Sequence, residues 1–241
     1  MAKILLCSDL HTEYHMDWGK SILSGLQTED VDVLVVAGDL TTGTFRLERN
    51  IDLLCSIFPE VVYVPGNHEY YGNSFQEIES TLMGLVHAHD NFTWLNNSKI
   101  KISGVNFIGA TLWFPDGPDV QLEKTFLSDF SQIEGFEPEV YKRNKDTIDY
   151  LTSNIKEGDV VVTHHLPSYY CVSDRFKGSK FNCFFANNLD NLILNSKPAV
   201  WMYGHTHDAG DFTIGSTRLV CNPLAYPGEP TGFSESFIVE V

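Results

Sequence analysis

Aspartate, asparagine and histidine residues recur along this 241-residue chain in short blocks whose residue types can ligate metal ions. The blocks are Asp9-Leu10-His11, Gly38-Asp39, Gly66-Asn67-His68-Glu69, His164-His165 and Gly204-His205-Thr206-His207. Carboxylate and imidazole ligands suit borderline and hard divalent cations such as Zn, Mn, Fe and Ni. Burying several of them together without a counter-ion would be very costly, and a pair of divalent cations removes that cost. Two ions roughly 3.5–4 Å apart can clamp the attacking and leaving oxygens of a phosphoryl transfer.

Each block directly follows a short apolar run, mostly of β-branched residues, that is typical of a buried strand. The predicted strands span residues 3–8, 33–37, 61–64, 159–163 and 199–203. Because ligand sites in α/β sheets form beyond the carboxyl ends of the strands, we expect the blocks to converge on one place. Residues i and i+2 of an extended segment point to the same side, which suits the Asp-x-His and His-x-His pairs. Asp39 has two carboxylate oxygens, so it can bridge both ions.

The rest of the pattern predicts a single α/β domain spanning residues 1–241, because strands alternate with helical periodicity as in βαβ units. Helices are predicted at 45–58, 73–89 and 138–156, a hairpin at 100–112, and antiparallel strands within 211–241, including 217–221 and 236–240. The segments 113–136 and 165–183 are rich in Gly, Pro, Ser and aromatic residues. We interpret these two segments as loop insertions over the site.

The bulk composition limits the partners of the protein. A formal net charge of −16 disfavours sequence-independent binding to nucleic acid, although cations in the site would still attract a small phosphorylated substrate. No stretch is long enough and apolar enough to span a membrane. The apolar N-terminal run meets Asp9 and His11 at once, so we interpret it as a strand rather than a signal peptide and expect a cytoplasmic protein. The five widely spaced cysteines, without a C-x-x-C pair, fit a reducing compartment.

The ordered set Asp-x-His, Gly-Asp, Gly-Asn-His-Glu, His and Gly-His-x-His resembles the calcineurin-like metallophosphoesterase superfamily, over residues 9–207. All of the blocks stand in the order of that family, and each follows a predicted strand. The resemblance implies a four-layer α-β-β-α sandwich, with two facing mixed β-sheets and the metal site at the C-terminal ends of the strands. In the fourth block His164 matches the family position, because it directly follows Thr163.

The resemblance also implies a role for individual residues. The implied metal ligands are Asp9, His11 and His207 for one ion and Asn67, His164 and His205 for the other, with Asp39 as the bridge. His68 resembles the catalytic histidine that faces the leaving group, and Glu69 resembles its orienting partner. Asn67 would also help to hold the charge on the phosphate oxygens. Phosphoprotein phosphatases of the family carry an arginine soon after the Gly-Asp block, whereas the next arginine here is Arg46, so we expect the substrate to be held differently.

The predicted reaction is the hydrolysis of a small phosphomonoester or phosphodiester, in which a hydroxide bridging two divalent ions attacks phosphorus in line. The ions are Mn, Fe, Zn or Ni, and both phosphatase and phosphodiesterase activity fit the sequence. Two alternatives stay open. A nuclease is disfavoured by the net acidity, and a non-catalytic scaffold of the same fold is disfavoured by the complete ligand set. The oligomeric state is left open.

Several residues outside the blocks have two interpretations. Aromatic residues after predicted strand ends either stack against the substrate or pack between loops. These residues are Tyr70, Tyr71, Trp113, Phe114, Tyr169 and Tyr170. His165 and the turn cluster Tyr226-Pro227-Gly228 belong either to the site or to its structural surroundings. Arg175 and Lys177 either contact a second phosphate or are ordinary surface charges.

Overall fold

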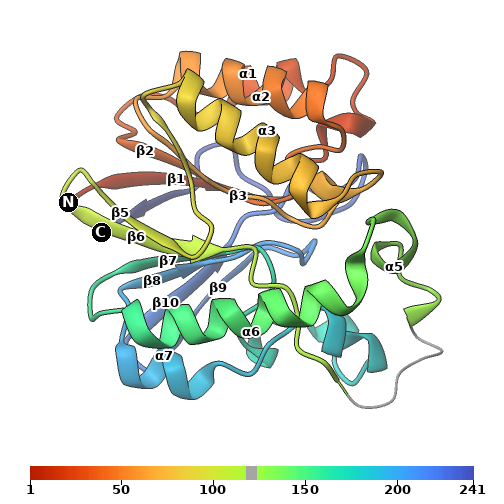
Figure 1. The fold of residues 1–241 in the computed structure, drawn as a ribbon. Helices are drawn as coiled ribbons and strands as arrows, with labels where there is room; N and C mark the ends of the chain where they lie inside the picture. The colour runs from red at the N-terminus through yellow and green to blue at the C-terminus, as the bar shows by residue number, and fades with distance from the viewer. Residues whose placement is uncertain (118–123) are drawn as a thin grey trace.

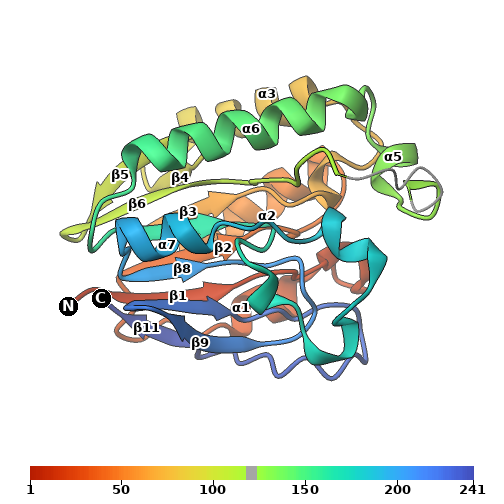
Figure 2. The same cartoon turned by 90° about the horizontal axis from the view of Figure 1, so that it is seen from below.

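Two β-sheets face each other in the computed structural model, which describes residues 1–117 and 124–241 (Figure 1). Helices cover the outer face of each sheet, so the layers follow the order helix, sheet, sheet, helix (Figure 1). This is the four-layer sandwich that the sequence predicted. The two chain ends lie side by side in both ribbon views (Figures 1 and 2), where the amide of Ala2 donates to the carbonyl of Val241 at 2.8 Å.

The first sheet has the strand order β11-β1-β2-β3-β4. The strands β1 (Lys3–Cys7), β2 (Val33–Ala37), β3 (Val61–Val64) and β4 (Phe92–Trp94) pair in parallel. The last strand of the chain, β11 (Ile238–Glu240), pairs antiparallel with β1. The carboxyl ends of β1, β2 and β3 therefore lie at one edge, where the chain continues into the first three ligand blocks.

The second sheet has the strand order β5-β6-β7-β8-β10-β9. Its strands are β5 (Ser98–Ile102), β6 (Val105–Ala110), β7 (Val160–Thr163), β8 (Val200–Met202), β9 (Gly210–Ile214) and β10 (Thr217–Cys221). The four central strands are parallel, and β5 and β9 pair antiparallel at the two edges. The two remaining ligand blocks follow β7 and β8.

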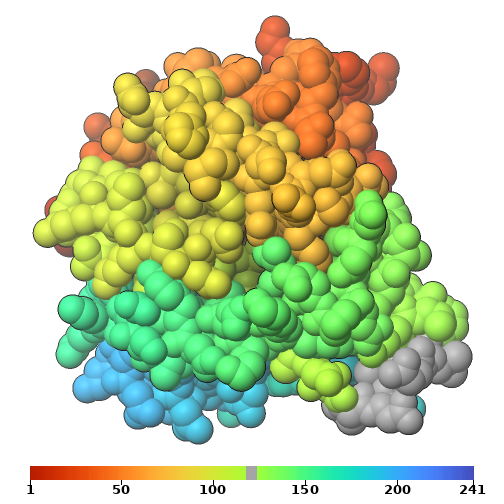
Figure 3. All heavy atoms as spheres, viewed as in Figure 1, coloured from red at the N-terminus to blue at the C-terminus, as the bar shows by residue number. Residues whose placement is uncertain are grey.

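The helices divide between the two outer faces. Over the first sheet lie α1 (Lys20–Gly25), α2 (Thr44–Ile57) and α3 (Phe75–Ala88), and over the second sheet lie α6 (Phe136–Asn154) and α7 (Asp190–Ser196) (Figure 1). The short helix α5 (Asp129–Gln132) precedes α6. Single 3-10 turns span Thr12–Tyr14, His68–Tyr70, Tyr169–Cys171, Asp174–Phe176 and Lys180–Phe184. Side chains close the space between the two halves on the face shown in Figure 3.

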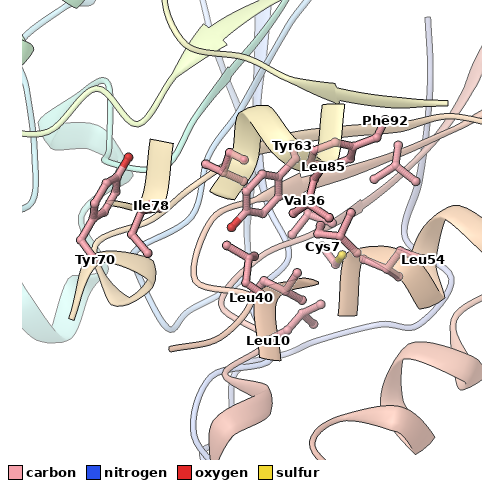
Figure 4. Close-up of a cluster of buried hydrophobic side chains, with 14 of the residues drawn as sticks. Cys7, Leu10, Val36, Leu40, Leu54, Tyr63, Tyr70, Ile78, Leu85 and Phe92 are labelled. Atoms are coloured by element: carbon pink, nitrogen blue, oxygen red, sulfur yellow. The ribbon is translucent and has the colours of Figure 1, made fainter. Parts of the chain in front are cut away.

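Successive strand residues point into different layers of the core, because side chains alternate across a strand. In β1, Leu5 packs toward the helices, whereas Leu6 packs between the two sheets. Figure 4 shows the outer layer, where Tyr63 of β3 lies among apolar side chains that include Leu54 of α2 and Ile78 of α3. Burial on both faces explains why these strands are continuous apolar runs rather than alternating ones.

Most of the predicted elements are confirmed, with small shifts of their ends. The helix predicted at 73–89 is α3, which Ser74 and Glu77 begin with a capping box: the hydroxyl of Ser74 accepts from the amide of Glu77, and the carboxylate of Glu77 accepts from the amide of Ser74. The predicted tail strands are confirmed, but β10 joins the second sheet and β11 the first, and β10 also pairs in parallel with β8. Short elements without a clear period, namely α1, β4 and α7, were not predicted.

Other expectations concern the loops and the membrane. Part of the predicted insertion 113–136 lies outside the described residues, which omit 118–123. No helix within residues 1–117 or 124–241 combines the length and the apolar character that crossing a bilayer requires. None of the cysteines forms a disulfide within the described residues, and Cys7, Cys171 and Cys221 are buried.

Candidate metal centre

The ligand blocks meet at the edge of the sandwich where β1, β2, β3, β7 and β8 end. Asp9, Asp39 and His205 have positive φ angles of 51°, 53° and 65°, a backbone conformation that non-glycine residues seldom adopt. Such conformations cluster at functional sites, where the surrounding structure holds them in place. A Cβ on Gly66 would lie 2.6 Å from the amide nitrogen of Asp39, so only glycine permits this approach of β2 and β3.

Side chains of the blocks form overlapping groups whose ligand atoms all lie within 4.8 Å of one another. The groups are Asp9, His11 and His207; Asp39, His164 and His205; and His11, Asp39 and His68. Oδ2 of Asp39 lies 3.7 Å from Nε2 of His11 and 3.5 Å from Nε2 of His164. This carboxylate oxygen therefore stands between the first two groups, which is the position that a bridging ligand requires.

The group around His164 directs nitrogen and oxygen atoms to its centre. Nδ1 of His164 donates to the carbonyl of Ala37 at 2.9 Å, so Nε2 is the ring nitrogen that faces the centre. Nε2 lies 3.1 Å from both Oδ1 of Asn67 and Nδ1 of His205. The amide of Asn67 is held in this orientation because its Nδ2 donates to Asp129 at 2.8 Å. Nitrogen and oxygen atoms that face one another at these distances fit a bound cation, which would replace a ring proton.

The group around His11 repeats this arrangement. Nε2 of His11 and Nε2 of His207 lie 3.3 Å apart, and Oδ1 of Asp9 lies 4.0 Å from Nε2 of His207. The other ring nitrogens face carboxylates: Nδ1 of His11 lies 3.2 Å from Glu13, and Nδ1 of His207 lies 2.7 Å from Glu229. Carboxylate partners of this kind fix the tautomer and orientation of metal-ligating histidines. The donor set therefore fits divalent cations.

The ionisable groups of the centre shift one another's pKa values. Burial alone raises the pKa of the Asp39 carboxyl, but His164 and His68 outweigh burial and hold this pKa well below its usual range. Burial alone lowers the pKa of His164, whereas the charge of Asp39 raises it to about 9. Burial and the neighbouring His165 lower the pKa of His205 well below its usual range, so this ring is neutral. A charged Asp39 beside a neutral His205 ring favours the binding of a cation between these two side chains.

His68 lies beside the two groups rather than inside them. Its backbone amide donates to Oδ1 of Asp39 at 2.9 Å, which places the ring next to the bridging carboxylate. Nδ1 lies 3.4 Å from Oε1 of Glu13, and Nε2 lies 3.4 Å from the hydroxyl of Tyr226. Burial alone lowers the pKa of His68, but Asp39 and Glu13 raise it to about 9. The ring can therefore carry a proton close to the metal ligands.

Glu69 does not supply the carboxylate that contacts His68. Its oxygens accept from the amides of Leu40 at 2.6 Å and Gly66 at 2.6 Å, and from those of Asp39 and Thr41 at 3.2 Å. Glu69 thus ties the loop after β2 to the loop after β3, and so positions Asp39. The carboxylate beside His68 belongs to Glu13.

Comparison with known proteins places this geometry in a family. The family model described as calcineurin-like phosphoesterase matches residues 2–209. The chain belongs to the calcineurin-like phosphoesterases. With its ligand groups, this membership identifies it as a metal-dependent phosphoesterase.

The relatives span viruses and bacteria. Uncharacterized protein L509 of Acanthamoeba polyphaga mimivirus is 27% identical over 268 residues, which cover 97% of this chain and 95% of that protein. An uncharacterized metallophosphoesterase of Helicobacter pylori (strain ATCC 700392 / 26695) is 29% identical over 117 residues, or 46% of this chain and 30% of that protein.

Among solved structures, the phosphopantetheinyl hydrolase PptH of Mycobacterium tuberculosis matches with a TM-score of 0.75 at 18% identity, covering 94% of this chain and 90% of that one. The protein TT1561 of Thermus thermophilus matches with a TM-score of 0.61 at 12% identity, covering 92% of this chain and 89% of that one. At such low identities these two matches establish the fold.

The residues for which the sequence allowed either a site role or a packing role lie in different parts of this calcineurin-like phosphoesterase. His165 is fully buried, and its ring packs against that of His205 with centroids 4.3 Å apart. Tyr226 reaches the site, where its ring centroid lies 4.6 Å from that of His11. Tyr71 lines the cleft, whereas Tyr169 and Tyr170 are exposed outside it. The remaining aromatics, Tyr70, Trp113 and Phe114, are buried in a hydrophobic cluster with Phe75 of α3 and Phe136 of α6.

Arg175 and Lys177 of the segment 165–183 each pair with an acidic residue. Arg175 pairs with Asp208 at 2.8 Å, and Lys177 pairs with Asp174.

Some residues around the phosphoesterase ligands were not predicted. Glu13 lies in the 3-10 turn Thr12–Tyr14 rather than in an extended segment, so its spacing from His11 carried no signal. Asp129, the first residue of α5, and Glu229 are distant in sequence from the ligand blocks, so only the fold reveals their contacts with Asn67 and His207.

Proposed function

We propose that the protein hydrolyses a small phosphate ester with two divalent cations. The proposed ligands are Asp9, His11 and His207 for one cation and Asn67, His164 and His205 for the other, with Asp39 shared. The observation that carries the proposal is the position of Oδ2 of Asp39 between two groups of possible ligand atoms. The complete donor set favours catalysis over a non-catalytic scaffold.

Bound divalent cations supply a nucleophile at neutral pH, by bringing the pKa of water to about 7, and they neutralise charge on phosphate oxygens. The residues of the chain orient this chemistry. Asp129 turns the amide of Asn67 so that its oxygen faces the metal ligands. Glu13 and Glu229 hold the rings of His11 and His207 with their Nε2 atoms toward each other.

His68 is the proposed proton donor to the leaving oxygen. Glu13 accepts from Nδ1, so Nε2 faces the cleft beside Tyr226 and can donate there. The proposed role of Glu69 is to hold Asp39 and the two loops through backbone amides, while Glu13 orients His68.

The first experiment is a panel of substrates and metals on the purified chain. We expect turnover of nitrophenyl esters with at least one of Mn, Fe, Zn, Ni or Mg, and loss of turnover after metal removal. The panel includes nucleotides, cyclic nucleotides and a phosphopantetheinyl ester, the class named for PptH. Single-stranded RNA and DNA represent the nuclease alternative. Failure to hydrolyse any phosphoester with any metal would refute the proposed function.

Glu13→Gln tests the proposed proton donor, with Glu229→Gln as a matched control. Each carboxylate contacts a metal-ligating histidine, but only Glu13 also contacts His68. Loss of such a partner typically costs about 10- to 100-fold in metal affinity or activity, and we expect this for both variants. Only Glu13→Gln should also slow the hydrolysis of esters with poor leaving groups more than the hydrolysis of nitrophenyl esters. Equal leaving-group dependence in the two variants would contradict the link between Glu13 and His68.

A further inference from the structure

Two cavities border His68, and the larger, which also borders proposed metal ligands, has a volume of about 540 Å³. Asp39, Asn67, His205 and His207 stand in its wall, so a phosphate held by the metals lies at its base. Its other lining includes polar residues, among them Ser173, Ser179, Asn182 and Thr206. We call it the apolar lobe after its hydrophobic lining, which is Phe126, Leu127, Leu166, Val172, Phe176, Phe181, Phe184 and Phe185. A volume of this size accommodates a substituent far larger than a phosphate group alone.

The charged groups of the apolar lobe are already paired. Arg175 lies against Asp208 at 2.8 Å, and its guanidinium covers the ring of Phe176 at 4.6 Å. The carboxylate of Asp129 accepts from Tyr71 at 2.6 Å and from Asn67. Because these charges have partners, the lobe offers a new ligand mainly apolar surface.

The smaller cavity, of about 410 Å³, has the opposite character. We call it the polar lobe. Its own lining is Tyr14, Thr42, Gly43, Arg46, Gly72 and Gln132. The Nε of Arg46 donates to the carbonyl of Thr42 at 2.8 Å, and no carboxylate pairs with this arginine among residues 1–117 and 124–241. The polar lobe therefore keeps an uncompensated positive charge and hydrogen-bonding groups for a ligand.

The two lobes meet at the proposed proton donor. His68, Tyr71, Ser128 and Tyr226 line both cavities, so these side chains form the shared wall. A phosphomonoester has one substituent and would fill one lobe. A phosphodiester has two, and a phosphorus atom at the metal ligands can direct one into each lobe.

We propose that the substrate is an unsymmetrical phosphodiester whose apolar substituent occupies the apolar lobe and whose polar substituent occupies the polar lobe. This inference rests on the proposed function. Because His68 lies at the border with the polar lobe, the polar substituent is the leaving group. Water forms the new bond to phosphorus, the bond to the polar alkoxide breaks, and the alkoxide takes up a proton. The products are a polar alcohol and an apolar phosphomonoester.

Hexyl glyceryl phosphate tests the assignment of the lobes, because it can break in two ways. We expect hexyl phosphate and glycerol to exceed hexanol and glycerol phosphate by at least roughly tenfold, measured by phosphorus NMR. In water labelled with heavy oxygen, the label should appear in hexyl phosphate, because water forms the new bond to phosphorus. A product mixture without preference, or a preference for hexanol, would overturn the proposal.

Two variants, each with a matched control, test which lobe binds which substituent. Phe176→Ser removes an apolar side chain from the apolar lobe. Its control is Leu194→Ser, which changes a side chain of α7 outside both lobes. The two side chains match in exposure, because each is 46% exposed. Arg46→Gln removes the charge of the polar lobe, and Arg49→Gln removes a neighbouring charge of α2 that lines neither lobe. We expect only Phe176→Ser to weaken binding of hexylphosphonate, and only Arg46→Gln to raise KM for the glyceryl diester.

Calorimetry with phosphonates gives a readout that is independent of turnover. Hexylphosphonate should bind roughly tenfold or more tightly than methylphosphonate, because its additional methylene groups leave water for the apolar lobe. Equal affinities would overturn the assignment of this lobe. If nitrophenyl phosphate is hydrolysed but the glyceryl diester is not, the diester inference is wrong and the proposed function stands. If no phosphoester is hydrolysed, both are wrong.

Discussion

Asp39→Asn is expected to lower kcat/KM for nitrophenyl phosphate by roughly a thousandfold or more and to reduce the bound metal. The variant keeps the oxygen that accepts from the amide of His68, but it removes the negative charge between His11 and His164. Cations contribute several kcal/mol of charge stabilisation in the transition state, and a loss of about 4 kcal/mol corresponds to about a thousandfold. Metal analysis and kinetics on the same preparation measure both effects.

Asp159→Asn is the matched control for this substitution. Asp159 is 1% exposed and Asp39 is 2% exposed, but Asp159 lies at the opposite end of β7, where it accepts from Asn106 and the amide of Lys156. We expect this variant to lose stability and to keep its metal content and its kcat. Unchanged metal content and turnover in Asp39→Asn would contradict the shared bridging ligand.

His68→Ala is expected to keep both metal ions and to lower turnover about 10²- to 10⁴-fold for a substrate with a poor leaving group, which is the usual contribution of a general acid or base. The effect should shrink for a nitrophenyl ester, because nitrophenolate hardly needs a proton. Parallel assays with an alkyl ester and a nitrophenyl ester measure the difference within one variant.

His205→Ala provides the contrast. Nδ1 of His205 lies 3.1 Å from Nε2 of His164, so its loss should lower metal occupancy and slow both substrates alike. His68 also lies within reach of a cation, because it forms a group with His11 and Asp39. Loss of metal from His68→Ala, or an equal effect on both esters, would show that His68 is a ligand rather than the proton donor.

The fold was largely predictable from local patterns. Strands such as β2 and β3 are buried on both faces, so their apolar runs are uninterrupted and easy to recognise. The helix α3 shows both its periodicity and its capping box in the sequence. The short elements α1, β4 and α7 have too few residues to display a period. Their formation depends on packing against parts of the chain that are distant in sequence.

The pairing of the tail strands could not be predicted from the tail alone. The strands β10 and β11 have similar apolar character, yet they join different sheets. Register and sheet membership depend on which edge is free, and this is a property of the assembled sandwich.

The sequence by itself determined which residue types stand at the candidate metal centre. Each ligand block is covalently attached to the end of a strand, and parallel strands bring their carboxyl ends to one edge. Asp9, Asp39 and His164 were therefore predictable in identity and in neighbourhood.

Only the tertiary structure decided how the partners of these ligands are arranged. Glu69 is adjacent to His68 in sequence, but it lies in a 3-10 turn that directs its carboxylate to backbone amides of two loops. Glu13, from another loop, contacts His68 instead. The apolar and polar lobes likewise combine side chains from segments far apart in the chain. Side-chain direction and long-range proximity depend on the packed fold, because residues distant in sequence become neighbours only when the two sheets assemble.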